Sequence, residues 1–173
     1  LHENRMGQVM LGEGAVEDVT VQRRTKEELE SSRALNAATI DSLGANLAIL
    51  DPVGNVVSVN RAWQDFRGNL AFGGEGFEGG LAVGLNYLDA CDQASGPTAA
   101  VAAETSAGIR SVLSGHSELF ELEYPMEAPD SRWFHIRVTP LRRTEGARGG
   151  DIRRGAVMTH LDITEQHRAQ PTL

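Results

Sequence analysis

Cys91 is the only cysteine in the 173-residue chain, and a cysteine paired with a histidine could act as a nucleophile. Asp89 and Asp92 oppose that chemistry, because carboxylates beside the thiol raise its pKa and keep it protonated. One cysteine also excludes a zinc site built from several thiolates. The sequence contains no HExxH, GxSxG or GxxxxGK[ST] motif. It therefore predicts no catalytic residue and no metal site.

Charge and composition limit the partners. A net charge of −8 and a pI of about 5.1 oppose nucleic-acid binding, which depends on clustered Lys and Arg. No apolar run approaches the roughly 20 residues of a membrane helix, so no membrane contact is expected. A lone cysteine gives no reason to expect an oxidising compartment. With 40% hydrophobic and 23% charged residues, the sequence predicts one globular domain in the cytoplasm.

The N-terminal part favours a helix over residues 23–43, because this segment lacks Gly and Pro and is rich in Glu, Lys, Arg, Ala and Leu. Its apolar positions form only a thin stripe, which suits a linker helix that buries one seam against a partner helix or a sheet face. We therefore expect a homodimer that forms through this helix, with the contact residues Leu29, Leu35 and Leu43.

The middle of the chain begins with a hairpin. LAILD and VVSVN are short β-branched runs joined by the turn at residues 52–55. Asn60 is placed to cap a short helix that carries Trp63 and Phe66 at helical spacing. The Gly-rich residues 73–80 indicate a loop, and two helices are expected after it, at residues 85–93 and 97–115.

The final third alternates like half-buried strands. Segments 117–124, 131–141 and 153–162 place aromatic and aliphatic residues on one face and polar residues on the other. A short helix is expected to follow from Ile163. Strands at both ends with helices between them predict an α+β fold, in which one antiparallel sheet carries its helices on one face.

The sequence contains five features in this order: LAILDPVGNVVSVN, the Asn60 helix start, GLNYLDAC, RWFHIRVTPL and GAVMTHLDITE. On these features, which follow the family's order, the sequence resembles a PAS domain over about residues 38–166. PAS domains are sensory modules of bacterial signalling proteins. The resemblance implies a five-stranded antiparallel sheet of order 2-1-5-4-3 that cups a pocket between the sheet and the helices. PAS domains commonly end in Asp-Ile-Thr and continue as a helix toward the next domain.

The ending GAVMTHLDIT has an echo in GAVEDVT at residues 14–20. By the same resemblance, residues 1–22 look like the tail of a preceding PAS domain or a linker, and a local strand pairing is the alternative. The other predicted parts follow in order: a linker helix at 23–43, the PAS domain at 44–164, and the start of an exit helix at 165–173.

The resemblance also tests known cofactor chemistries. Flavin-binding photosensor PAS domains carry Gly-x-Asn-Cys, but here Tyr87 stands at the cysteine position. Haem-binding PAS domains usually take a proximal histidine from the long helix, and residues 97–115 contain none; His116 falls just beyond them. His135 and His160 on the last strands leave haem as an alternative. The sequence thus argues against both cofactors, and an unknown small ligand stays open.

A ligand pocket between sheet and helices would have polar candidates in Asn60, Tyr87 and His160, the last being a candidate pH-sensitive group. A closed core without a ligand is the alternative. The expected apolar lining comes from the inward faces of the strands and helices: Trp63, Phe66, Leu113, Phe120, Leu122, Phe134, Ile136 and Met158.

The residues Asp162, Ile163 and Thr164 form the expected signal relay. Asp and Thr can cap the outgoing helix, which makes a rigid joint between sheet and helix. The resemblance implies a sensory module in a multidomain signalling protein, with a sensor histidine kinase as the expected parent and adjacent PAS and transmitter domains as partners. A diguanylate cyclase or phosphodiesterase parent and a ligand-free dimerisation module are the alternatives.

Overall fold

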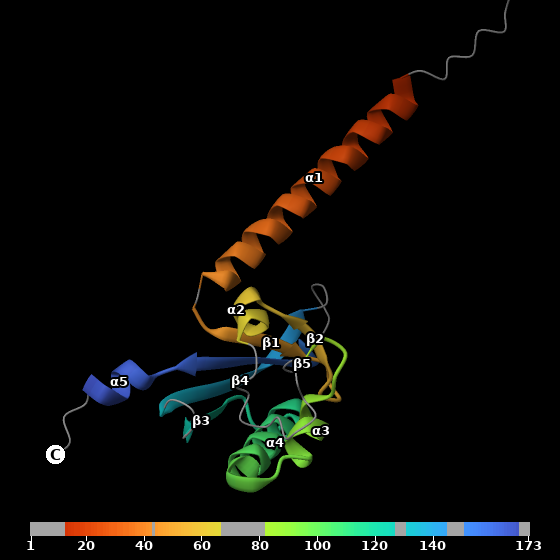
Figure 1. Ribbon diagram of the computed structural model, residues 1–173. Coiled ribbons are helices and arrows are strands. Elements are labelled where there is room, and N and C mark those ends of the chain that lie inside the picture. Colours follow the sequence, from red (N-terminus) through yellow and green to blue (C-terminus); the bar gives the residue numbers. More distant parts are fainter. Residues whose placement is uncertain (1–12, 43, 67–81, 127–130, 145–150, 170–173) are drawn as a thin grey trace, which may run out of the picture. The chain divides into compact units, whose positions relative to one another are not determined.

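The computed structural model describes residues 13–42, 44–66, 82–126, 131–144 and 151–169 (Figure 1). The chain divides into two units, residues 1–40 and residues 41–173. Nearly all of helix α1 (Glu13–Asp41) lies in the first unit, and the second unit contains the sheet with the remaining helices. Each unit is described by itself.

Helix α1 begins well before the predicted start at Arg23 and includes residues 14–20. The alternative of a local strand pairing at these residues is therefore wrong, whereas a tail of a preceding PAS domain or a linker at residues 1–22 stays a prediction. A strand needs a hydrogen-bonded neighbour, and none of the described strands pairs with these residues. A helix satisfies its backbone groups internally, and the ion pairs Arg23–Glu27 and Lys26–Glu30 link successive turns.

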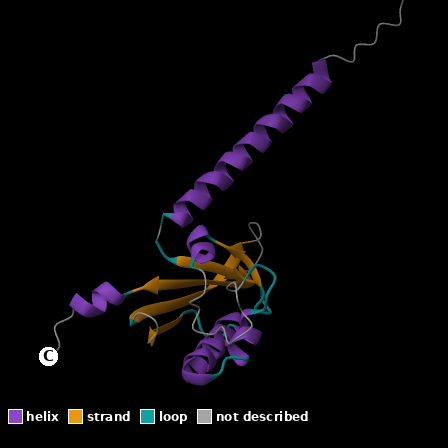
Figure 2. Cartoon of the chain, in the orientation of Figure 1, coloured by secondary structure: helices purple, strands orange, loops and turns teal. Residues whose placement is uncertain are grey.

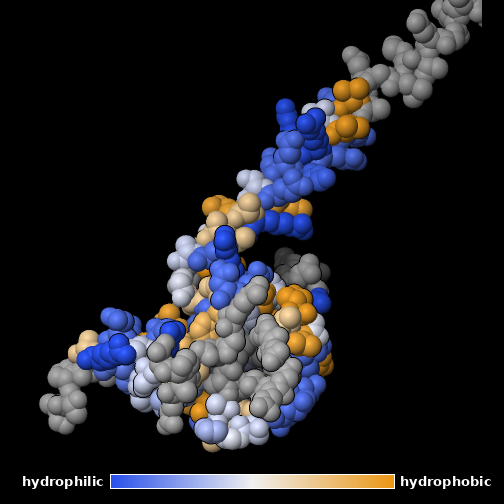
Figure 3. All heavy atoms as spheres, in the orientation of Figure 1, coloured by the Kyte–Doolittle hydropathy of each residue, from blue (hydrophilic) through white to orange (hydrophobic). Residues whose placement is uncertain are grey.

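Side chains from Val16 to Thr39 are all exposed, and α1 is largely hydrophilic (Figure 3). Of the residues expected in a dimer contact, Leu29 is 49% and Leu35 is 68% exposed. Leu43 lies outside the described residues. No helix in the described part of the chain is long and apolar enough to cross a membrane.

Five strands form one sheet in the order β2-β1-β5-β4-β3, and all neighbouring pairs are antiparallel. This order confirms the predicted fold. Figure 2 shows the strands gathered in one sheet. The last two strands extend further toward their connecting loop than the alternation predicted. The strands are β1 (Asn46–Leu50), β2 (Val56–Val59), β3 (Phe120–Met126), β4 (Arg132–Thr144) and β5 (Asp151–Asp162).

The helices of the second unit are α2 (Arg61–Asp65), α3 (Tyr87–Asp92), α4 (Ala99–Ser114) and α5 (Thr164–Ala169). A single 3-10 turn, Gly96–Thr98, precedes α4. Helix α4 packs on β3, β4 and β5 and ends at Gly115, whose φ of 86° is the left-handed conformation that favours glycine. The expected loop at 73–80 lies outside the described residues.

The core lies between the sheet and the helices. The predicted alternation holds in β4, where Phe134, Ile136 and Val138 are buried. Ile136 is opposite His160 of β5, and Val138 is opposite Met158, so the central strands present a continuous face to the helices. Burying one such apolar side chain stabilises the fold by roughly 1.5–3 kcal/mol. The buried residues of the described part are mostly apolar, and the buried polar ones are Asn60, Thr105, Ser106, His160 and Thr164.

Candidate functional site

A small polar cluster lies inside this core, around His160 of β5. The Nε2 atom of His160 is 3.3 Å from the hydroxyl oxygen of Tyr87, at the start of α3. Trp63 of α2 approaches the imidazole edge-on, with 5.5 Å between ring centroids and an interplanar angle of 83°. The cluster thus brings together a strand and two helices that are distant in sequence.

His160 is neutral at ordinary pH, because burial lowers its pKa to about 3. Its second ring nitrogen, Nδ1, has no hydrogen-bond partner, and neither has the buried hydroxyl of Thr105 on α4. A buried polar atom without a partner costs free energy, so such atoms mark places that a water or a polar ligand group could occupy. The described core contains no buried Asp, Glu, Lys or Arg. The described core is therefore better suited to an uncharged ligand than to a charged one.

Asn60, the third polar candidate, uses its side-chain amide to hold the fold together. Its Oδ1 accepts hydrogen bonds from the backbone N–H groups of Leu47 (2.9 Å) and Trp63 (3.0 Å). Its Nδ2 donates to the carbonyl oxygen of Ala45 (2.8 Å). The predicted helix cap is confirmed, and the same side chain joins α2 to the start of β1. The geometry gives Asn60 a structural role; a ligand contact stays a prediction.

The predicted apolar lining gathers around the core but differs in burial. Four of its members are almost completely buried: Trp63, Phe134, Ile136 and Met158. Phe66, Leu113 and Phe120 are partly buried and pack against these residues, and Leu122 is half-buried on β3. Phe120 also lies against Gly108 of α4, where a Cβ atom would be only 2.3 Å from its ring. The lining residues thus share one face of the sheet.

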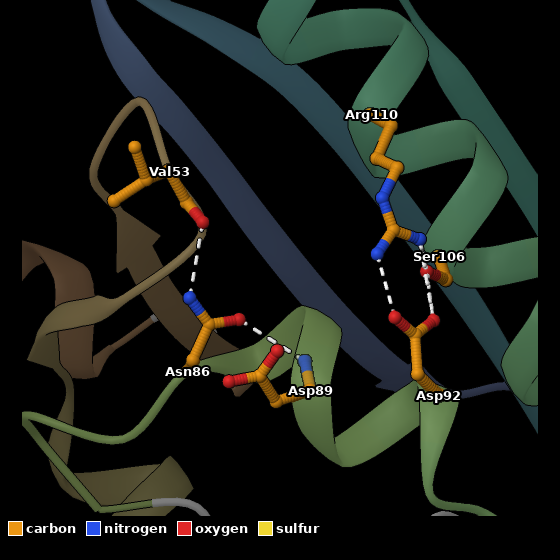
Figure 4. Close-up of polar contacts among 6 residues, drawn as sticks. All are labelled: Val53, Asn86, Asp89, Asp92, Ser106 and Arg110. Carbon is orange, nitrogen blue, oxygen red and sulfur yellow. Dashed lines mark hydrogen bonds and ion pairs between the residues drawn. The ribbon is translucent and has the colours of Figure 1, made fainter.

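Asn86, in the segment compared with flavin-binding PAS domains, has a structural role as well. It caps α3 by accepting a hydrogen bond from the Asp89 N–H (3.0 Å) and donates to the carbonyl of Val53 (3.0 Å) (Figure 4). The hairpin turn is therefore tied to α3. Tyr87, which stands where those photosensors have cysteine, is completely buried, and burial raises its pKa well above the usual value.

Cys91 is unsuited to nucleophilic chemistry. Burial, with a further contribution from Asp92, raises the pKa of its thiol to about 12. The direction matches the sequence expectation, but burial is the larger cause. Asp92 itself pairs with Arg110 of α4 (Nη2 to Oδ2, 2.7 Å) and accepts a hydrogen bond from Ser106 (3.0 Å) (Figure 4). These contacts fasten α3 to α4, and they lower the pKa of Asp92.

The expected relay residues lie where β5 passes into α5. Oδ1 of Asp162 accepts a hydrogen bond from the Thr164 N–H (2.9 Å), which caps the helix as predicted. The Thr164 hydroxyl donates to the same Oδ1 (2.5 Å) and also accepts a hydrogen bond from the Trp133 N–H of β4 (3.0 Å). The Ile163 N–H donates to the Trp133 carbonyl (2.8 Å). We call Asp162, Ile163 and Thr164 the exit joint; it binds α5 to two strands.

Residues beyond the joint also hold α5, and sequence reasoning missed them. The imidazole of His167 stacks on the indole of Trp133, with centroids 4.0 Å apart and planes at 11°. His167 Nε2 is 3.3 Å from Oε2 of Glu123 on β3. Both rings border a shallow depression of about 200 Å³ that also includes Ser131, Thr164 and Arg168. The sequence did contain one signal for this contact: Trp133 is a large apolar residue at an outward-facing position of β4, where a covering element is expected.

Within the described residues, no group of three or more His, Cys, Asp or Glu side chains is placed to hold a metal ion. His135 contacts Glu121 of β3 (3.6 Å) on the sheet, away from the buried His160. The two histidines that had kept haem as an alternative therefore do not share one site.

Comparisons with known proteins agree with this architecture. The model of a family described as PAS fold matches residues 40–168. A protein of Rhodobacter capsulatus described as "Uncharacterized 104.1 kDa protein in hypE 3'region" is 39% identical over 132 residues, which are 75% of this chain and 13% of that protein. The chain thus spans only a small part of that relative.

Among solved structures, the phage VqmA–DPO complex has 19% identity and a TM-score of 0.52, covering 83% of this chain and 58% of that one. The sensor region of a sensor histidine kinase has 22% identity and a TM-score of 0.47, covering 71% and 41%. At these identities the likeness concerns the fold alone.

Proposed function

Because this chain belongs to the PAS family, whose model matches residues 40–168, we propose that it senses a small ligand or a partner and relays the change through the exit joint. The observation that carries the proposal is the position of His160. It lies in the core on β5, and the same strand leads directly into Asp162 and α5. A displacement of β5 at His160 therefore acts on the joint without an intervening loop.

The ligand we propose is a small uncharged molecule with one hydrogen-bonding group. The free Nδ1 of neutral His160 would pair with that group, and the aromatic rings of Trp63 and Tyr87 would contact its apolar part. Native mass spectrometry of the purified chain tests this: we expect extra mass that dissociates on denaturation. The His160→Gln variant is the comparison, and we expect it to carry less of this extra mass. Wild-type protein that shows no extra mass even after incubation with cell extract would contradict ligand binding.

The relay is tested by substitutions at Thr164. Thr164→Val keeps the shape of the side chain but removes the hydroxyl that accepts the Trp133 N–H bond, whereas Thr164→Ser keeps the hydroxyl. We expect the valine variant to uncouple the output of the parent protein from its stimulus and the serine variant to preserve the coupling. Equal, normal coupling in both variants would show that the joint does not carry the signal.

We propose a sensor histidine kinase as the parent, with this module in the cytoplasm between an upstream PAS domain and a transmitter domain. A helix before the sheet and a helix after it suit an internal domain of a multidomain chain. A diguanylate cyclase or phosphodiesterase parent has the same support. Incubation of the full-length protein with labelled ATP, with GTP and with a cyclic dinucleotide, each separately, distinguishes them: phosphohistidine supports the kinase, cyclic dinucleotide formation supports the cyclase, and cyclic dinucleotide hydrolysis supports the phosphodiesterase.

A ligand-free dimerisation module is the second candidate, and the exposure of α1 favours it. A long helix with no buried side chain from Val16 to Thr39 is marginally stable alone and gains stability from a partner helix. We expect Leu29→Asp with Leu35→Asp to leave the circular dichroism of the sheet unchanged and to produce monomers in analytical ultracentrifugation. Glu28→Asp with Glu30→Asp serves as the control for altered helix propensity. An unchanged dimer would contradict the proposed contact.

A further inference from the structure

We propose that the exit joint responds to pH, with His167 as the proton acceptor that fastens α5 to the sheet. This inference rests on the relay function proposed above and adds a regulator to it. It starts from the two contacts of one imidazole: a parallel stack on Trp133 of β4 and an approach to the Glu123 carboxylate of β3.

Protonation strengthens both contacts. A planar cation over an indole face is attracted by the ring quadrupole, and the 4.0 Å stack at 11° holds the imidazole in that position. The Nε2 atom lies 3.3 Å from Oε2 of Glu123, so a charged imidazole turns this contact into an ion pair. Histidine is the side chain whose charge ordinarily changes between about pH 5 and 8.

The remaining charges around the ring compensate one another. Arg132 pairs with Asp162, at 3.9 Å, and Arg137 pairs with Glu121, at 3.7 Å. On α5 itself, Glu165 and Arg168 flank the histidine with opposite signs. The charged and titratable groups of the elements packed here are Glu121 and Glu123 on β3, Arg132, His135 and Arg137 on β4, Asp162 on β5, and Glu165 and Arg168 on α5. Of these, Glu123 is the group in direct contact with the His167 ring.

The contacts of the ring restrain the backbone of the relay. The N–H of His167 donates to the carbonyl of Ile163 (2.9 Å), which is the middle residue of the exit joint. When α5 detaches from the sheet, the ring loses Trp133 and Glu123 together, and this first turn of the helix is released. Docking of α5 should therefore increase as the pH falls, and the joint should become stiffer.

Hydrogen exchange of the residue-167 amide measures this directly. Protection factors, referred to the unfolded chain at each pH, should rise about threefold to tenfold between about pH 8 and pH 5.5, the gain expected from one partly exposed ion pair and one cation–π contact. We expect His167→Gln to abolish the rise and Glu123→Gln, which leaves the Trp133 stack in place, to reduce it. The control His135→Gln, which removes a histidine that contacts Glu121 on the same sheet, should retain it.

The outcomes separate a proton sensor from a merely structural contact. A structural role would lower protection in the glutamine variants by the same factor at every pH, whereas a sensor changes the ratio between the two pH values. A wild-type ratio near one overturns the inference. Should Thr164→Val still uncouple the parent in that case, the relay stands and only its regulation by protons is wrong.

Discussion

Gly155→Ala is expected to lower the free energy of unfolding by about 3 kcal/mol or more, which is a large part of the stability of an ordinary domain. Gly155 has a φ of 133°, a conformation that side-chain-bearing residues rarely adopt. A Cβ atom there would lie 1.8 Å from the carbonyl oxygen of Leu50 on β1. Because that atom belongs to the backbone, the clash can be relieved only by separating β1 from β5.

Urea unfolding followed by circular dichroism gives the measurement, and Gly84→Ala is the matched control. Gly84 also has a positive φ, of 96°, but no atom lies within 4 Å of its would-be Cβ. It therefore isolates the conformational cost, about 1–3 kcal/mol, from the clash. Equal losses in the two variants would show that β1 and β5 tolerate the added methyl group.

Acid is expected to destabilise the domain through His160. The folded-state pKa of about 3 is below the ordinary value of 6.5, so the chain takes up a proton when it unfolds. The stability from this group is complete above pH 6.5 and is lost as the pH falls toward 3. At 1.36 kcal/mol per pH unit, the loss between about pH 6.5 and pH 5 is about 2 kcal/mol. The carboxyl groups with lowered pKa, Asp51 and Asp92, act at lower pH.

His160→Leu removes this dependence and also the Tyr87 contact, so the variant starts less stable at neutral pH. The difference between wild type and variant should then shrink by about 2 kcal/mol as the pH falls from about 7 to 5, measured by urea unfolding at each pH. His135→Gln, a change at a histidine outside the core, should leave the slope nearly unchanged. Parallel curves for wild type and His160→Leu would mean that His160 is already charged or solvated when folded.

Most of the fold could be predicted from local patterns, because each pattern reports a strong physical constraint. Alternation in segment 131–141 placed Phe134 and Ile136 inward correctly, since a strand side chain has only two faces. Asn60 before an apolar helical spacing identified the cap of α2. The PAS resemblance supplied what alternation does not contain, the order of the strands, and that order is confirmed.

The errors and omissions share a cause: they depend on what lies beside a segment in space. Residues 14–20 read as a strand by likeness to residues 155–164, yet they are helical, since none of the described strands pairs with them. The stack of His167 on Trp133 joins α5 to β4 across the sheet end, and no spacing in the sequence records it. The amide of Asn60 looked available to a ligand because its bonds to Ala45 and Leu47 are tertiary.

The pairing of β1 with β5 has a mechanical consequence. The two strands are antiparallel neighbours, and Asn46 at the start of β1 is opposite His160 near the end of β5. The chain therefore enters and leaves the sheet at the same end of this pair. Tension applied through the flanking helices would load the β1–β5 hydrogen bonds one after another, as in a zipper, instead of shearing them together. The domain should yield at low force, with the pair Asn46–His160 separating first.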